Sequence, residues 1–304
     1  MFPKQSRREF LGTLAIAFAA RNVSAAPSQI ASTKLTDNLT VVTGAGGNIV
    51  VLSQPDGLLL VNGGLAETAA DLNKFLSDQF KGQQVKAVFN TDWHLEHTGS
   101  NDLFKKAGAK MYAHENTKLW IGADFYSEWD KHTYKPRPAT ALPTDTFYTS
   151  GKMTFGKDPI EYGYMPQAHT DGDIYVFFPA QNVLVAGDIV SVGQYPLLDY
   201  VTGGWIGGLQ TALKDLLKVA KPDTRVIPGT GPVLSHADLQ AESEMVDTMR
   251  ERLVNLMRQG MGPSDMIAAQ PTKEFDAKWG SPDLFIRNAY HGMWGHVREL
   301  GRIV

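Results

Sequence analysis

The chain of 304 residues contains no cysteine, which excludes disulfides, thiolate metal ligands and cysteine nucleophiles together. It has no long basic run, and its formal net charge is −3, so nucleic acid is not an expected partner. Its apolar stretch near the start, residues 11–20, is too short to cross a bilayer as a permanent helix, so we expect no stable membrane anchor. With 43 % hydrophobic residues, the chain can form one large core or two joined halves.

The first 26 residues have the pattern of an export signal. Arg7 and Arg8 stand before the apolar stretch, and small residues ending at Ala26 suit signal cleavage. Residues 1–26 therefore resemble a twin-arginine signal peptide, which implies the twin-arginine export machinery as a partner and the periplasm as the destination. The alternative is an ordinary amphipathic tail. A periplasmic protein without cysteine is consistent, because no thiol can mispair there.

Residues 27–304 alternate between strand and helix patterns. Short apolar runs separated by glycine and proline predict strands, and apolar residues at helical spacing predict helices. The first half is expected to have strands at 39–43, 48–53, 58–62, 85–89 and 110–114, with helices at 65–80, through 104 and from 115. The second half is expected to have strands between 153 and 190 and at 225–227, with helices at 209–219 and 237–257 and a helical tail.

Four potential metal ligands lie within six residues, directly after the predicted strand at 85–89. They are Asp92, His94, Glu96 and His97, and the first three alternate along the chain. Imidazole and carboxylate hold zinc and similar ions, and a loop at a strand end can aim alternate side chains at one point. The alternative is a polar loop whose histidines only form hydrogen bonds.

Two later strand ends carry the same kinds of side chain. His169 precedes the apolar run at 174–178, and Asp188 ends another run at 184–187. Three such ends converging would form a metal site. Asp171 and Asp173 lie close enough in sequence to orient His169 by hydrogen bonds, and Asp173 is also suited to cap the backbone that follows.

At this point the chain resembles the metallo-β-lactamase superfamily. The family pattern is His-x-His-x-Asp-His, a later His before a Gly-Asp pair, a bridging Asp at a strand end, and a Pro-Gly-His-Gly loop. Here the matching positions are His94, His97, His169 and Asp188, and the last loop is Pro228-Gly229-Thr230-Gly231. The resemblance covers nearly all of the chain beyond about residue 35 and implies an α/β fold, the four-layer αβ/βα sandwich, with metal at the edge where two sheets meet.

The resemblance also implies two ligand sets. The first metal would be held by Asp92, His94 and His169, and the second by Glu96, His97 and Asp188, with Asp188 able to bridge both. Asp92 and Glu96 stand where the family has His and Asp, and Thr230 stands where it has a last His. A hydroxyl is a poor replacement for imidazole, and added carboxylate favours harder ions, so one or two zinc ions are expected, with manganese or iron as alternatives.

Residues 121–150 predict a long irregular loop rich in aromatic residues and proline. By resemblance it would cover the site; the alternative is that its aromatic residues only pin it to the core. The histidines His114, His132 and His236 are isolated, and His291 and His296 are too far apart in sequence to share a metal well, so none of the five is a candidate ligand.

These observations predict a metal-dependent hydrolase that acts on a small-molecule substrate. A metal-activated water would attack an ester, lactone, thioester, amide or related bond, with Glu96 and Asp188 as the catalytic carboxylates that position it. The alternative is a non-catalytic periplasmic binding or accessory protein with a degenerate metal site, which the substitutions at Asp92, Glu96 and Thr230 would suit.

Overall fold

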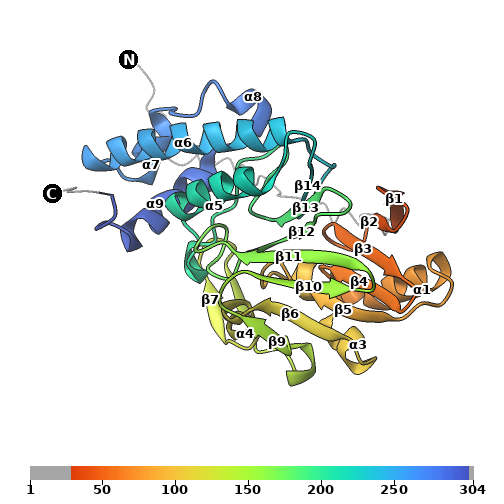
Figure 1. The fold of residues 1–304 in the computed structure, drawn as a ribbon. Coiled ribbons are helices and arrows are strands. Elements are labelled where there is room, and N and C mark those ends of the chain that lie inside the picture. Colours follow the sequence, from red (N-terminus) through yellow and green to blue (C-terminus); the bar gives the residue numbers. More distant parts are fainter. Residues whose placement is uncertain (1–28, 301–304) are drawn as a thin grey trace, which may run out of the picture.

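The computed structural model describes residues 29–300. Within that range the strands form two main sheets, of seven and five strands, and a separate two-stranded ribbon. The two sheets pack face to face, and helices cover their outer faces (Figure 1). This is the predicted four-layer αβ/βα sandwich.

The seven-stranded sheet has the order β1-β2-β3-β4-β5-β6-β9. Neighbours from β1 to β4 pair antiparallel, whereas β4, β5, β6 and β9 pair in parallel. The bounds are β1 Ala31–Lys34, β2 Leu39–Thr43, β3 Ile49–Gln54, β4 Gly57–Val61, β5 Val85–Phe89, β6 Lys110–His114 and β9 Asp145–Phe147. The parallel strands place the chain segments that follow them at one edge of the sheet.

The five-stranded sheet has the order β10-β11-β12-β13-β14, and only its last pair, β13 and β14, is parallel. The bounds are β10 Gly151–Phe155, β11 Asp158–Tyr164, β12 Ile174–Phe178, β13 Val183–Gly187 and β14 Arg225–Pro228. The backbone N–H of Ile174 donates to the carbonyl of Thr91 at 2.8 Å, which ties this sheet to the loop after β5.

One apolar layer fills the space between the sheets. Phe89, Leu59 and Val50 from the first sheet meet Phe178 and Val185 from the second. The opposite faces of the strands in each sheet pack against helices, so the central strands are buried on both sides and have continuous apolar sequences such as that of β4.

The outer layers are helical. The buried faces of α1 and α3 pack on the first sheet through Leu72, Leu76 and Phe104, and α5, α6 and α9 cover the second sheet. The helix bounds are α1 Ala69–Gln79, α2 Leu95–Thr98, α3 Asn101–Lys106, α4 Glu115–Ile121, α5 Ile206–Val219, α6 His236–Arg258, α7 Pro263–Ala268, α8 Asp276–Trp279 and α9 Asp283–Gly295, with short 3-10 turns η1 Ala66–Thr68, η2 Ala139–Ala141 and η3 Tyr200–Thr202. No helix among residues 29–300 is both long and apolar enough to span a membrane.

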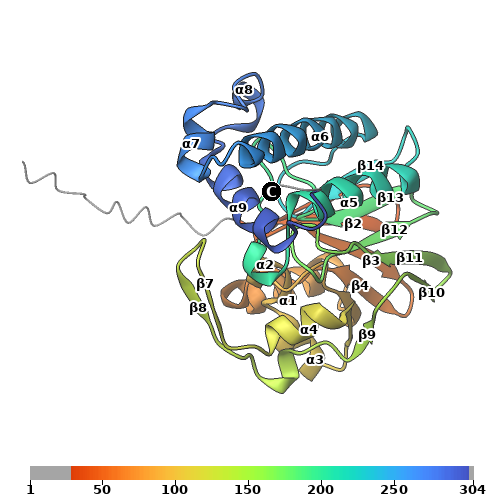
Figure 2. The ribbon, with the colours of Figure 1, turned by 90° about the vertical axis from the view of Figure 1, so that its left-hand side faces the viewer.

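The structure differs from the sequence expectations at β1, which was not expected, at the start of α5, and in the segment 121–150, which also supplies β9. Helix α5 begins at Ile206 rather than 209. The sequence did not indicate this start because Gly207 and Gly208, which are weak helix formers, occupy the first turn. A Cβ at position 208 would lie 1.9 Å from the carbonyl oxygen of Gln167, so the close packing there requires glycine. The segment 121–150 is partly regular: β7 Phe125–Ser127 and β8 His132–Tyr134 form an antiparallel ribbon at the side of the molecule (Figure 2).

The predicted signal, residues 1–26, lies outside the described residues.

Candidate metal centre

The loop after β5 carries the first group of site residues. Its shape is fixed from within, because Asp92 Oδ1 accepts the backbone N–H of His94 at 2.9 Å and Thr98 Oγ1 donates to the carbonyl of His94 at 3.0 Å. The Asn90 amide donates to the carbonyl of His97 at 3.0 Å. His94 immediately precedes α2, and His97 lies within it.

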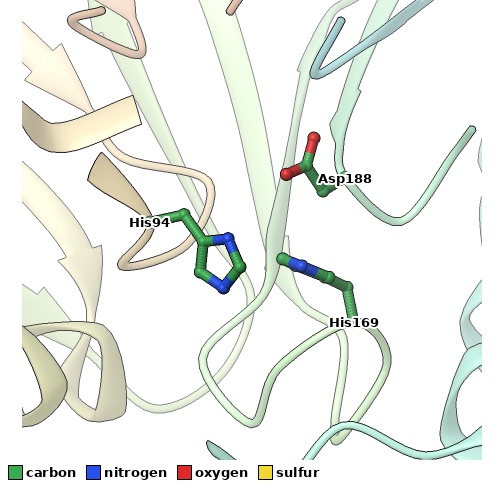
Figure 3. A group of neighbouring side chains, drawn as sticks. All are labelled: His94, His169 and Asp188. Carbon is green, nitrogen blue, oxygen red and sulfur yellow. The ribbon is translucent and has the colours of Figure 1, made fainter. Parts of the chain in front are cut away.

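The segments before β12 and after β13 and β14 complete the site. His169 and Asp173 lie between β11 and β12, Asp188 follows β13, and Gly229 follows β14. In Figure 3 the His94 and His169 rings and the Asp188 carboxylate face a common space from different chain segments. The fold therefore gathers residues that are more than ninety positions apart in the sequence.

Three groups of side chains among the described residues have ligand atoms within 4.8 Å of one another. They are His94, His169 and Asp188; Asp92, His97 and Asp188; and Asp92, His169 and Asp173. Asp188 belongs to the first two groups, so its carboxylate stands between two possible ion positions.

This grouping differs from the split that the resemblance implied. Asp188 is grouped with both His94 and His169, which agrees with its expected bridging place. Asp92 is grouped with His169 and Asp173, and also with His97, whose Nε2 lies 3.6 Å from Asp92 Oδ2. Glu96 belongs to none of the three groups found within residues 29–300. It lies on the first turn of α2, its Oε1 is 3.9 Å from His94 Nδ1, and its side chain is 36 % exposed. It therefore lines the adjoining cavity and at the same time lies close to the His94 ring.

The buried histidines have the ring environment that an ion would suit. His97 and His169 are fully buried, and neither has a hydrogen bond of good geometry at either ring nitrogen. The Nε2 of His97 nevertheless lies 3.1 Å from Asp188 Oδ2. Buried polar atoms without partners are costly and rare, and a cation between imidazoles and carboxylates would satisfy them. The donor set fits zinc, and its carboxylates also fit manganese or iron.

The electrostatics of the site agree with that fit. Burial alone would lower the pKa of His97, but the carboxylates of Asp92 and Asp188 raise it to about 10. Burial would also raise the pKa of Asp188, yet His97 and the other rings hold it well below its usual range. The residues thus form a buried negative pocket that holds positive charge, as protons or as metal ions.

Asp199 is a site residue that the sequence patterns missed. It is fully buried, and its Oδ2 lies 3.3 Å from His94 Nε2 and accepts the Thr202 hydroxyl at 2.6 Å. Its Oδ1 accepts Trp129 Nε1 at 2.9 Å. When Nε2 of His94 donates to this carboxylate, Nδ1 is left as the nitrogen open to an ion. Asp199 lies eleven residues beyond Asp188 in an irregular loop, where no strand-end pattern indicates it.

The other predicted site residues, Asp173, Asp171 and Thr230, differ in what they contact. Asp173 Oδ1 is 3.4 Å from His169 Nδ1, while its carboxylate accepts both the N–H and the hydroxyl of Thr170, so it contacts the ring and also caps the backbone. The Asp171 carboxylate instead accepts Trp120 Nε1 at 2.7 Å, and burial raises its pKa to about 6. Thr230 lines the cavity beside Asp188.

The turn after β14 packs tightly on the ligands. A Cβ on Gly229 would lie 1.8 Å from Asp188 Oδ1 and 3.1 Å from His97 Cε1, so any larger residue would have to displace the Asp188 carboxylate. Asn48 holds this turn by donating from Nδ2 to the carbonyls of Pro228 and Gly231, each at 2.9 Å.

A cavity of about 160 Å³ opens beside the ligands and is lined by Glu96, Asp188, Val190, Ser191, Gln194, Leu197 and Thr230. A larger cavity, of about 620 Å³, is lined by residues such as Asp37, Gln54 and Asp158, none of which belongs to the ligand groups. The smaller cavity is the candidate substrate pocket because it contacts Asp188.

One wall of this pocket belongs to the segment 189–204, which supplies Val190, Ser191, Gln194 and Leu197 to the lining and is held by the C-terminal helices. Asn288 in α9 donates to the carbonyl of Leu198 at 3.0 Å, and His291 stacks on Tyr200 with ring centroids 5.0 Å apart. Tyr195 donates to Asp276 in α8 at 2.8 Å. The ribbon β7–β8 reaches the same wall through Trp129, which places part of the 121–150 segment beside the site.

Comparisons with known proteins agree with this geometry. Residues 42–250 match the Metallo-beta-lactamase superfamily, and the chain therefore belongs to that family. It is 25 % identical over 195 residues to the metallo-beta-lactamase type 2 of Elizabethkingia meningoseptica, covering 61 % of this chain and 72 % of that protein. It is 24 % identical over 187 residues to the enzyme of the same name from a Bacillus species, covering 61 % of this chain and 67 % of the relative.

Solved structures share the fold. A metallo-beta-lactamase from Pontibacter korlensis superposes with a TM-score of 0.59 at 21 % identity, covering 72 % of this chain and 99 % of that one. A stereoselective inverting sec-alkylsulfatase from a Pseudomonas species superposes with a TM-score of 0.64 at 16 % identity, covering 86 % of this chain but only half of that protein. Family membership supports metal-dependent hydrolysis in general terms.

Proposed function

We propose that this protein hydrolyses an ester, lactone, thioester or amide bond in a small molecule, using one or two divalent ions. The observation that carries the proposal is the pair of ligand groups that share Asp188 next to a cavity. Zinc is the first choice of ion, with manganese or iron as alternatives.

A bound ion would lower the pKa of water toward neutrality. Water itself would then serve as the nucleophile, and no nucleophilic side chain is needed. His94, His169, Asp92, His97 and Asp188 would hold the ions. Asp188 and Glu96, which both line the cavity, accept hydrogen bonds from the attacking water and orient it toward the scissile carbonyl. Asp199 keeps the His94 ring in place from the opposite side.

The chemical change is a hydrolysis in which a bond forms between the water oxygen and the carbonyl carbon. The bond from that carbon to the leaving oxygen, sulfur or nitrogen breaks, and a proton from the water passes to the leaving atom. No oxidant or second substrate is required.

The test measures bound metal by plasma mass spectrometry on protein purified without chelator, together with a panel of ester, lactone, thioester and amide substrates. His169→Ala should lower metal content, thermal stability and turnover together, because ligand loss removes binding energy that favours the folded state. His132→Ala is the matched control, since His132 lies on the exposed strand β8 and in none of the ligand groups. Equal metal content in wild type and His169→Ala would refute this site.

The second candidate is a binding or accessory protein. Its supporting observation is Thr230, a hydroxyl at the position where the family pattern has a metal-binding histidine. Full metal occupancy without turnover on the panel, with any of the three ions, would favour it.

We also propose that the protein is exported to the periplasm by the twin-arginine machinery, on the strength of Arg7-Arg8 and the apolar stretch that follows. Replacing both arginines with lysine should hold the precursor in the cytoplasm. Unchanged recovery of the protein from the periplasm would contradict the proposal.

A further inference from the structure

The chain segments that build the site carry no lysine or arginine. None occurs in residues 87–104, which contain Asp92, His94 and His97, or in residues 158–213, which contain His169, Asp188 and Asp199. None occurs in residues 226–249, which contain the turn at Gly229. All the residues that line the small cavity are likewise acidic, neutral polar or aliphatic.

The neighbouring 121–150 segment contains three cations: Lys131 is exposed, and the other two, Lys135 and Arg137, are engaged elsewhere. Arg137 donates to the carbonyls of Thr98 and Gly99 at 2.7 and 2.9 Å, which anchors α2. Lys135 pairs with Asp124 at 2.8 Å. These contacts direct both side chains to protein partners.

Negative charge, by contrast, is concentrated at the site. Its five carboxylates are Asp92, Glu96, Asp173, Asp188 and Asp199. Two divalent ions would offset only four of those five charges, and a single ion would offset two. The loaded site therefore stays negative, and Glu96 and Asp188 present that charge to the cavity.

A charged substrate feels this field directly because the cavity is small and partly enclosed. An anion must approach a site that keeps a net negative charge and offers no lysine or arginine to pair with, whereas a cation is attracted by the same charge. The apolar part of the lining consists of Val190 and Leu197. It can contact the alkyl groups of cationic and anionic substrates equally well, so it does not discriminate between them.

We propose that the site selects esters or thioesters that carry no negative charge, and that a positive charge beside the scissile bond improves binding. This inference rests on the proposed hydrolase function and specifies its substrate class. It sets the protein apart from a hydrolase of sulfate or phosphate monoesters, whose substrates are anions at the reacting centre.

The test uses three thioesters of matched size on zinc-loaded protein: acetylthiocholine, its uncharged isostere 3,3-dimethylbutyl thioacetate, and the anion S-acetyl-3-mercaptopropionate. We expect kcat/KM to fall in that order, with at least a tenfold difference between cation and anion at low salt. The difference should shrink in 0.5 M NaCl, because salt screens the exposed part of the field. p-Nitrophenyl sulfate should be inert. A higher kcat/KM for S-acetyl-3-mercaptopropionate or for p-nitrophenyl sulfate than for acetylthiocholine would overturn the inference.

Variants locate the effect. Glu96→Gln should reduce the cation-to-anion ratio severalfold, and Gln194→Lys should raise kcat/KM for the anionic thioester. Glu67→Gln is the matched control, because Glu67 is an exposed acid on η1 and contributes no group to the site. An unchanged ratio in both Glu96→Gln and Gln194→Lys would also overturn the inference.

Calorimetry separates this inference from the hydrolase proposal. Choline and 3,3-dimethylbutan-1-ol share a shape and a hydroxyl, and choline should bind the zinc-loaded protein at least fivefold more tightly. If no thioester is hydrolysed but choline binds more tightly, the hydrolase proposal fails and the charge selection stands. Equal binding of the two alcohols would refute the charge selection whatever the turnover.

Discussion

Substitution of Asp199 tests whether the buried carboxylate sets the metal-binding tautomer of His94. In Asp199→Asn, an amide replaces the carboxylate. Oδ2 of that carboxylate accepts hydrogen bonds from His94 Nε2 and the Thr202 hydroxyl, and Oδ1 accepts one from Trp129 Nε1. If the amide N–H₂ faces His94, Nε2 must become an acceptor and the ring proton moves to Nδ1, the nitrogen needed for the ion. Metal affinity should then fall.

The magnitude follows from the contacts. Losing one buried hydrogen bond to a charged acceptor should lower the free energy of unfolding by about 2 kcal/mol. Loss of a carboxylate partner to a metal-binding histidine typically reduces metal affinity by roughly 10- to 100-fold. Asp199 has no exposed surface, so bulk water cannot replace the carboxylate.

The assay is chelator competition for zinc, combined with denaturant unfolding of the metal-free protein. Trp129→Phe is the control, because it removes one donor to Asp199 but leaves the His94 contact intact. It should cost stability while changing zinc affinity by less than about threefold, well below the loss expected for the aspartate. Wild-type zinc affinity in Asp199→Asn would refute the reasoning.

Two further substitutions probe the packing around the site. Gly229→Ala should displace Asp188 and lower metal stoichiometry, because the new Cβ would lie 1.8 Å from Asp188 Oδ1. Gly295→Ala is the control, because the space around Gly295 is open. Equal metal content in the two variants would contradict the prediction. Burial raises the pKa of Glu242, which lies in α6 and accepts the N–H of Ser191, to about 8 from 4.5. The protonated Glu242 side chain suits its buried position better than the ionised one. Its contribution to the free energy of unfolding is therefore full below pH 4.5 and is lost as the pH rises through 8. Glu242→Gln should raise the unfolding free energy at pH 9 by several kcal/mol relative to wild type, since one pKa unit corresponds to about 1.4 kcal/mol, and parallel stability curves from pH 5 to 9 would contradict it.

The fold could be predicted from the sequence because apolar periodicity and turn residues mark most elements. The long helix expected at 237–257 is α6, His236–Arg258, and the strand at 85–89 has the expected bounds. The start of α5 was harder, because Gly207 and Gly208 serve tertiary packing rather than helix propensity. The β7–β8 ribbon was missed because strands of three residues are too short to show a period.

The ligand candidates could be named from strand ends, but their pairing could not. Which carboxylate joins which histidine depends on the direction of each side chain, which the order of residues in the loop does not fix. Glu96 lines the cavity, whereas Asp92 is fully buried. Asp199 gave no signal because its role depends on distance in space from His94, 105 residues away in the chain.

The support of residues 189–204 comes from a part of the chain that lies beyond the family match. Every candidate ligand lies inside residues 42–250, the part shared with the superfamily, whereas Asn288 and His291, which hold the pocket wall, lie beyond it. Changes in the C-terminal helices can therefore reshape the candidate pocket without touching the candidate metal ligands. Trimming the chain to its shared part would keep the ligands and remove the support of the wall that faces the substrate.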